Sequence, residues 1–220
     1  DQDIVVIHKL GQIRVICRLT SIDDTNTGSQ TEKYRKTGES LLNIFAGHRT
    51  ESICITDLAG NHPATLAFAE GMVLGNYQFL RYRKDQKEKE SSLQTLVVSS
   101  PGLDEKSIAE LNILCKAVYT CRSLVNEPVA SLNAEKLAAD FETMAHEAGV
   151  KIEVLNKQKI EALKMGGLLA VNRGSLDPPT FSIMEYKPKH PVNQKPIVLV
   201  GKGVVYDTGG ISLKPTASMD

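Results

Sequence analysis

Short apolar runs, rich in β-branched residues, alternate along the chain with stretches whose apolar positions recur at helical spacing. Runs of about four to eight such residues are typical of strands, whereas helical spacing is typical of helices that bury one face. The first hundred residues predict strands at 4–7, 13–17, 52–55 and 93–99. A helix is predicted over residues 64–74, ending at Gly75. Strands that alternate with helices indicate an α/β domain.

Longer helices are predicted beyond the break at Pro101-Gly102. Residues 105–124 have apolar positions at helical spacing and predict one long helix, which Asn126-Glu127-Pro128 closes. A second amphipathic helix is predicted over residues 134–146, before Gly149. The long helix is therefore expected to connect two parts of the chain.

The predicted elements after residue 150 are short. They are strands at 151–155, 168–171, 180–186 and 196–200, and a helix at 157–164. Residues 197–200 are apolar on both faces, which is typical of a central strand covered by helices on both sides. Residues 201–220 supply little that covers such a strand, so either other chains complete the sheet or the natural polypeptide is longer.

These elements predict the α/β class. We expect an N-terminal α/β domain over residues 1–102, a connecting helix over 103–127, and the start of a second α/β domain over 128–220 with a mixed, largely buried sheet. Two polar segments interrupt the pattern. Residues 20–30 are expected to form turns, and residues 81–90 carry charges of both signs, which favours a solvated loop or helix end over a phosphate site.

Composition limits the class of protein. The 220 residues include 41% hydrophobic and 24% charged side chains, as in ordinary globular proteins. Lysine plus arginine and aspartate plus glutamate each total 26, so there is no overall basic field for nucleic acid or an anionic membrane. The longest apolar runs are far shorter than the ~20 residues needed to span a bilayer. The four cysteines lie far apart, which is typical of reduced thiols in a cytoplasmic protein.

The densest candidate chemistry follows the strand predicted at 196–200. Lys202, Asp207 and Lys214 lie among glycines near its carboxyl end, where α/β sheets place ligands. The dinucleotide fingerprint fails at Tyr206, and no phosphate-loop motif is present. Lys202 and Asp207 converge only if the chain turns between them, which Gly203 allows. Residue types alone leave a ligand site and a plain glycine turn with solvated lysines equally open.

Residues 200–215, followed by Met219-Asp220, closely resemble the first metal-binding segment of the leucyl (cytosol) aminopeptidases. The resemblance extends back through residues 165–175, 122–128 and 69–79, whereas the first 60 residues match in general character alone. Val205, Tyr206 and Thr208 depart from the commonest family residues.

The resemblance implies an enzyme that releases N-terminal amino acids from peptides with two divalent metal ions, zinc, manganese or magnesium. It implies that Lys202 is a metal ligand, that Asp207 bridges the two metals, and that Lys214 stabilises the developing oxyanion. The alternatives are a free surface amine for Lys202, a turn cap for Asp207 and a solvated charge for Lys214. The family also implies a cytoplasmic hexamer acting on peptide substrates.

The resemblance further implies that part of the site is missing from this chain. Asp220 matches an aspartate that precedes a family ligand by four residues, and the family's Asn-Thr-Asp-Ala-Glu-Gly-Arg motif is absent. The chain alone is therefore expected to be inactive. The five histidines, His8, His48, His62, His146 and His190, are interpreted as structural. The alternative function is a non-catalytic module for assembly or nucleic-acid contact, against which the zero net charge argues.

Overall fold

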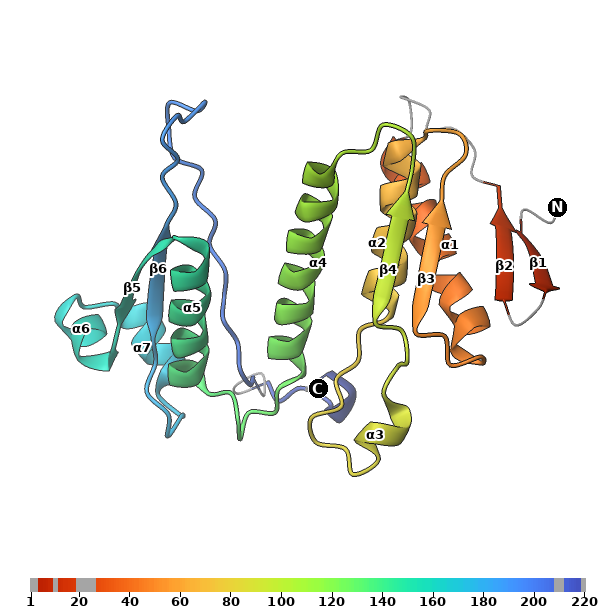
Figure 1. Cartoon of the computed structure of the whole chain (residues 1–220). Helices are drawn as coiled ribbons and strands as arrows, with labels where there is room; N and C mark the ends of the chain where they lie inside the picture. The colour runs from red at the N-terminus through yellow and green to blue at the C-terminus, as the bar shows by residue number, and fades with distance from the viewer. Residues whose placement is uncertain (1–3, 10–11, 19–26, 208–211, 219–220) are drawn as a thin grey trace. The chain divides into compact units, whose positions relative to one another are not determined.

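The computed structural model describes residues 4–9, 12–18, 27–207 and 212–218 (Figure 1). The chain forms two compact units, Asp1–Ser123 and Leu124–Asp220. The elements of the first unit are β1 (Ile4–Lys9), β2 (Gln12–Cys17), α1 (Thr27–Ala46), β3 (Ser52–Thr56), α2 (His62–Gly75), α3 (Gln86–Lys89), β4 (Thr95–Ser99) and α4 (Glu105–Asn126), whose last three residues belong to the second unit.

The four strands of the first unit confirm the four predicted there. β1 and β2 pair antiparallel, with Ile4 opposite Cys17. β3 and β4 pair parallel, with Ser52 opposite Thr95. A parallel pair needs a crossover connection, and α2 supplies it, lying behind the β3–β4 pair in Figure 1. The α/β class is confirmed.

Two glycines let α1 and α2 pack backbone against backbone. A Cβ added at Gly38 would lie 2.1 Å from the carbonyl oxygen of Phe68, and one added at Gly71 would lie 1.9 Å from that of Arg35. Arg35 also forms an ion pair with Glu70 across the two helices, at 2.9 Å. The core of this unit is built mainly from these helices and β3, with buried Tyr34, Leu41, Ile53, Ala64, Ala67, Phe68 and Met72.

The C-terminal part of α4 is fixed to the end of α2. Arg122 Nη1 donates to the carbonyl oxygen of Leu74 at 2.6 Å, and the Tyr119 hydroxyl donates to the carbonyl of Val73. The Tyr77 ring lies edge-on to Tyr119 at 5.1 Å and under the Arg122 guanidinium at 5.6 Å. A helix leaves its last carbonyls without partners, so α4 acts as a side-chain cap for α2.

The second unit contains α5 (Ala134–Ala148), β5 (Lys151–Leu155), α6 (Lys157–Ala162), α7 (Gly166–Asn172), β6 (Phe181–Glu185) and a short 3₁₀ turn, η1 (Thr216–Ser218). The Asn133 side chain caps α5 by accepting from the N–H of Lys136, and Gly149 ends the helix in the left-handed region at φ 65°. β5 and β6 pair antiparallel, with Lys151 opposite Glu185. The predictions for α5, β5, α6 and β6 are confirmed.

Three local predictions are wrong. Residues 168–171 lie in α7 instead of a strand, since four apolar residues in a row do not distinguish a strand from a helix turn. Residues 196–200 form no strand within the described part of the chain. Residues 197–200 are 74–93% exposed, and no described strand pairs with this segment. Residues 27–30, expected in turns, begin α1, while residues 20–26 lie outside the described residues.

Candidate functional site

The candidate segment of the second unit has an irregular backbone. The N–H of Val204 donates to the carbonyl oxygen of Lys202 at 3.0 Å, which closes a tight turn at Gly203. A Cβ at Gly203 would lie 3.3 Å from the Leu137 side chain of α5, so a glycine suits this close approach. From their spacing, Lys202 and Asp207 were expected to converge only if the chain turned between them, and the chain does turn at Gly203.

The structure brings the three predicted site residues together. Lys214 Nζ lies 3.3 Å from Asp207 Oδ2, and Lys202 Nζ lies 3.8 Å from the same oxygen. The side chains of Lys214 and Asp207 are 37% and 38% exposed, whereas that of Lys202 is 69% exposed. Ion pairs this accessible contribute about 0–1 kcal/mol to stability, so the cluster is not explained by a large stabilising effect.

The local charge is one carboxylate between two ammonium groups. Such a cluster attracts and holds negative charge, since its cations exceed its anions by one. It does not by itself fit a divalent metal ion, because it offers one anionic oxygen donor group and each amine must lose its proton before it can coordinate. Among the described residues, no group of three or more histidine, cysteine, aspartate and glutamate side chains is placed to hold a metal.

Neighbouring predictions fall partly outside the described structure. Thr208 and Asp220 lie among the residues that are not described. Of the histidines, His62 shares a 2.7 Å hydrogen bond between its Nε2 and the carbonyl oxygen of Pro101, and the rings of His8 and His48 lie 5.6 Å apart. These contacts fit the structural interpretation of the three residues. In the described ranges no helix has the length and apolarity needed to cross a membrane.

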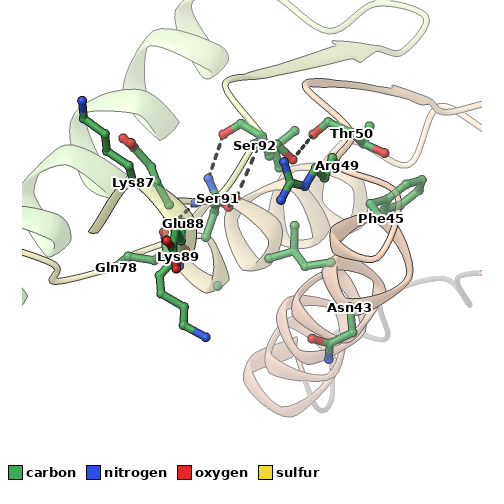
Figure 2. A pocket seen from close by; sticks show the side chains of 15 residues that line it. Asn43, Phe45, Arg49, Thr50, Gln78, Lys87, Glu88, Lys89, Ser91 and Ser92 are labelled. Atoms are coloured by element: carbon green, nitrogen blue, oxygen red, sulfur yellow. Dashed lines mark hydrogen bonds between the residues drawn. The ribbon is translucent and has the colours of Figure 1, made fainter. Parts of the chain in front are cut away.

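A pocket in the first unit was not predicted. It is lined by residues from the ends of α1 and α2 and from the segment that includes α3, among them Arg49, Lys87, Glu88 and Lys89 (Figure 2). The mixed charges of residues 81–90 were a sequence signal, but they were interpreted as solvated. Arg49 carried no sequence signal, because a single arginine after a helix is common on surfaces.

Comparison with known proteins gives a family match over the second unit and the end of α4. Residues 119–220 match the cytosol aminopeptidase family, catalytic domain. This range includes Lys202, Asp207 and Lys214.

Curated relatives extend the similarity toward the N-terminus. The chain is 41% identical over 164 residues to a probable cytosol aminopeptidase of Chlorobium limicola, covering 70% of this chain and 32% of the relative. It is 36% identical over 214 residues to a probable cytosol aminopeptidase of Chlorobaculum tepidum, covering 88% of this chain and 42% of the relative. The chain therefore spans less than half the length of these relatives.

Solved structures share the fold. The bottromycin maturation enzyme BotP in complex with Mn matches with a TM-score of 0.76 and 26% identity, covering 99% of this chain and 45% of that one. The apo leucyl aminopeptidase from Trypanosoma cruzi matches with a TM-score of 0.73 and 25% identity, covering 94% and 40%. The similarity thus includes the first unit, which lies largely outside the family match.

Proposed function

The chain belongs to the cytosol aminopeptidase family, with residues 119–220 matching the catalytic domain, and we propose that a protein of the relatives' length carrying this sequence is a metal-dependent aminopeptidase. It releases N-terminal amino acids from peptides. The observation that carries the proposal is the family match over residues 119–220, a range that contains Lys202, Asp207 and Lys214. When bound, two divalent ions, zinc, manganese or magnesium, would supply an activated water and polarise the scissile carbonyl.

Each residue has a separate task in this proposal. Asp207 would hold the ions with its carboxylate, and Lys202 would contribute its amine nitrogen as a further ligand. Lys214 keeps its charge and stabilises the negative charge that develops on the substrate's carbonyl oxygen. The lower exposure of Lys214 relative to Lys202 favours this division, because a partly shielded cation acts more strongly on a nearby charge. The remaining ligands come from the part of the relatives that this chain does not span.

The organisation follows the family. Residues 1–102 form the N-terminal domain, 103–127 the connecting helix and 128–220 the first part of the catalytic domain. The protein acts in the cytoplasm as a homo-hexamer on peptide substrates, and light scattering of the extended protein tests the assembly. Membrane and nucleic acid are not partners in this proposal, in keeping with equal numbers of acidic and basic residues.

The deciding experiment assays an aminoacyl amide with a version of the protein extended to the relatives' length, with zinc or manganese added. We expect metal-dependent release, and a loss on the order of 10²- to 10³-fold in kcat for Lys214→Ala. Lys187→Ala removes an exposed lysine of the same unit and is the matched control, with activity unchanged. The 220-residue chain is expected to be inactive. Activity that survives metal removal, or a Lys214→Ala variant equal to the control, contradicts the proposal.

A further inference from the structure

The pocket of the first unit has the size of a small-molecule site. Its volume is about 460 Å³, within the range of about 300–1,000 Å³ usual for ligand pockets. It lies where the ends of α1 and α2 meet the segment from Lys87 to Leu93 (Figure 2). All of its lining residues belong to the first unit, and none of them is a residue assigned to catalysis.

Hydrogen bonds hold one wall of the pocket in place. Gln78 donates its side-chain N–H to the carbonyl oxygen of Lys89 at 2.9 Å and accepts from the N–H of Ser91 at 2.7 Å. Asn76 donates to the carbonyl oxygen of Leu93 at 3.0 Å and accepts from the Ser91 hydroxyl at 2.6 Å. The two amides at the end of α2 therefore fix the backbone that carries the charged residues, so the wall is formed before any ligand arrives.

Arg49 supplies a positive group at the pocket. Its backbone has φ 48°, in the left-handed region that non-glycine residues seldom adopt. Its side chain is exposed and forms no hydrogen bond or ion pair with the described residues. Figure 2 shows it on the side of the pocket with Phe45 and Thr50, across Ser91 and Ser92 from Lys87 and Glu88. A guanidinium presents parallel donors that match a carboxylate.

The lining also includes charged residues of both signs and apolar residues. Lys87, Glu88, Lys89 and Glu90 all line the pocket, and neither glutamate forms an ion pair within the described structure. Leu42, Phe45 and Leu93 line it as well, and all three are partly buried against the core. A purely anionic ligand would leave two carboxylates beside its own charge, which is unfavourable. The lining instead fits a ligand that has both charges and an apolar body.

We propose that this pocket binds a zwitterionic free amino acid with an apolar side chain. Its carboxylate pairs with Arg49, its ammonium group pairs with Glu88 or Glu90, and its side chain packs on Leu42 and Phe45. The site is separate from the proposed catalytic residues and requires no metal ion.

The test is a titration of the 220-residue chain with L-leucine in EDTA, followed by calorimetry and by amide NMR shifts. We expect binding with shifts at Arg49 and Glu88. Leucinamide lacks the carboxylate and N-acetyl-leucine lacks the ammonium group, so each is expected to bind at least 10-fold more weakly. Inorganic phosphate is expected to leave these amides unshifted.

Arg49→Gly separates binding from folding. Glycine relieves the positive φ, so the variant is expected to keep the Tm of the parent chain while losing leucine binding at least 10-fold. Glu88→Gln with Glu90→Gln is expected to weaken leucine binding similarly, so that leucine no longer binds more tightly than N-acetyl-leucine, which lacks the ammonium group. Lys106→Gln removes an exposed cation elsewhere in the unit and is the control. Leucine binding that persists in Arg49→Gly, or phosphate binding that needs Arg49 while leucine does not bind, overturns the proposal.

Discussion

The Ser100 hydroxyl donates to Asp57 Oδ2 at 2.7 Å, across 43 positions of sequence. Ser100 follows β4 and Asp57 follows β3, so the contact joins the carboxyl ends of the two parallel strands. Asp57 also accepts from the N–H groups of Ala59 and Gly60, at 2.8 and 3.1 Å, and from the Thr65 hydroxyl of α2 at 3.0 Å. One carboxylate therefore ties together β3, β4 and the start of the crossover helix.

Replacing Asp57 with alanine is expected to lower the free energy of unfolding by about 2 kcal/mol, because the donors around it lose a charged acceptor. Urea unfolding at pH 7 measures the change. Glu110→Gln, an exposed position on α4, is the control and is expected to change stability by less than about 0.5 kcal/mol. Equal stabilities for the two variants would show that the carboxylate is not a structural centre.

The contribution of Asp57 is expected to depend on pH. Burial acts to raise the pKa of this carboxyl, and hydrogen bonds from Ser100, Ala59, Thr65 and Gly60 outweigh it, so the pKa is lowered overall. The folded chain therefore holds the proton less tightly than the unfolded chain, in which aspartates have a pKa of about 3.9. The stabilisation is complete above that value and is lost as the pH falls through the lowered pKa of the folded state.

The measurement compares urea unfolding of the parent chain and Asp57→Asn from pH 7 down to pH 3. Asparagine keeps the shape but does not titrate in this range. The stability difference is expected to be largest near neutrality and to shrink toward pH 3. A difference that stays constant, or grows in acid, would contradict the lowered pKa.

Gly71→Ala is expected to destabilise the first unit by about 3 kcal/mol or more, because the added methyl group collides with the backbone of Arg35. Gly28 provides a matched control on α1, since nothing lies within 4 Å of the Cβ that alanine would add there. Gly28→Ala is expected to raise stability slightly, by up to about 0.5 kcal/mol, through helix propensity. Thermal unfolding of both variants measures the two changes. A Gly71→Ala variant as stable as the parent chain would contradict the close approach of α1 and α2.

Arg122→Ala is expected to cost about 1–2 kcal/mol, since it removes the donor to the Leu74 carbonyl and the contact with the Tyr77 ring. Arg122→Lys keeps the charge but has no planar guanidinium, so it is expected to recover part of the loss. Hydrogen exchange at the end of α2 should rise in the alanine variant. Unchanged exchange there would contradict the capping role of α4.

Local patterns predicted several elements well. The helix at 105–124 has apolar positions at helical spacing, the strands at 52–55 and 93–99 are runs rich in β-branched residues, and each element was found near its predicted bounds. Residues 168–171 and 197–200 are short apolar runs that fit either structure. Their state depends on which segments pair with them, which a local pattern does not contain.

The sequence also predicted only part of the candidate sites. The types and spacing of Lys202 and Asp207 permitted a cluster, and the turn at Gly203 brings it about. Their proposed chemistry came from resemblance, because a lysine is not a usual metal ligand. The pocket of the first unit was missed because Arg49 and Glu88 lie far apart in sequence and line the same cavity only through the packing of α1, α2 and the α3 segment.

The glycine contact between α1 and α2 also bears on the order in which the chain folds. Gly38 and Phe68 lie closer in sequence than Leu74 and Arg122, which are 48 positions apart, so closing the α1–α2 contact costs less entropy than closing the contact between α2 and α4. β3 lies between α1 and α2 in the sequence. If the helix pair forms early, β3 packs against a surface that already exists. We therefore expect mutations at the α1–α2 crossing to slow refolding, and those at Arg122 to speed unfolding instead.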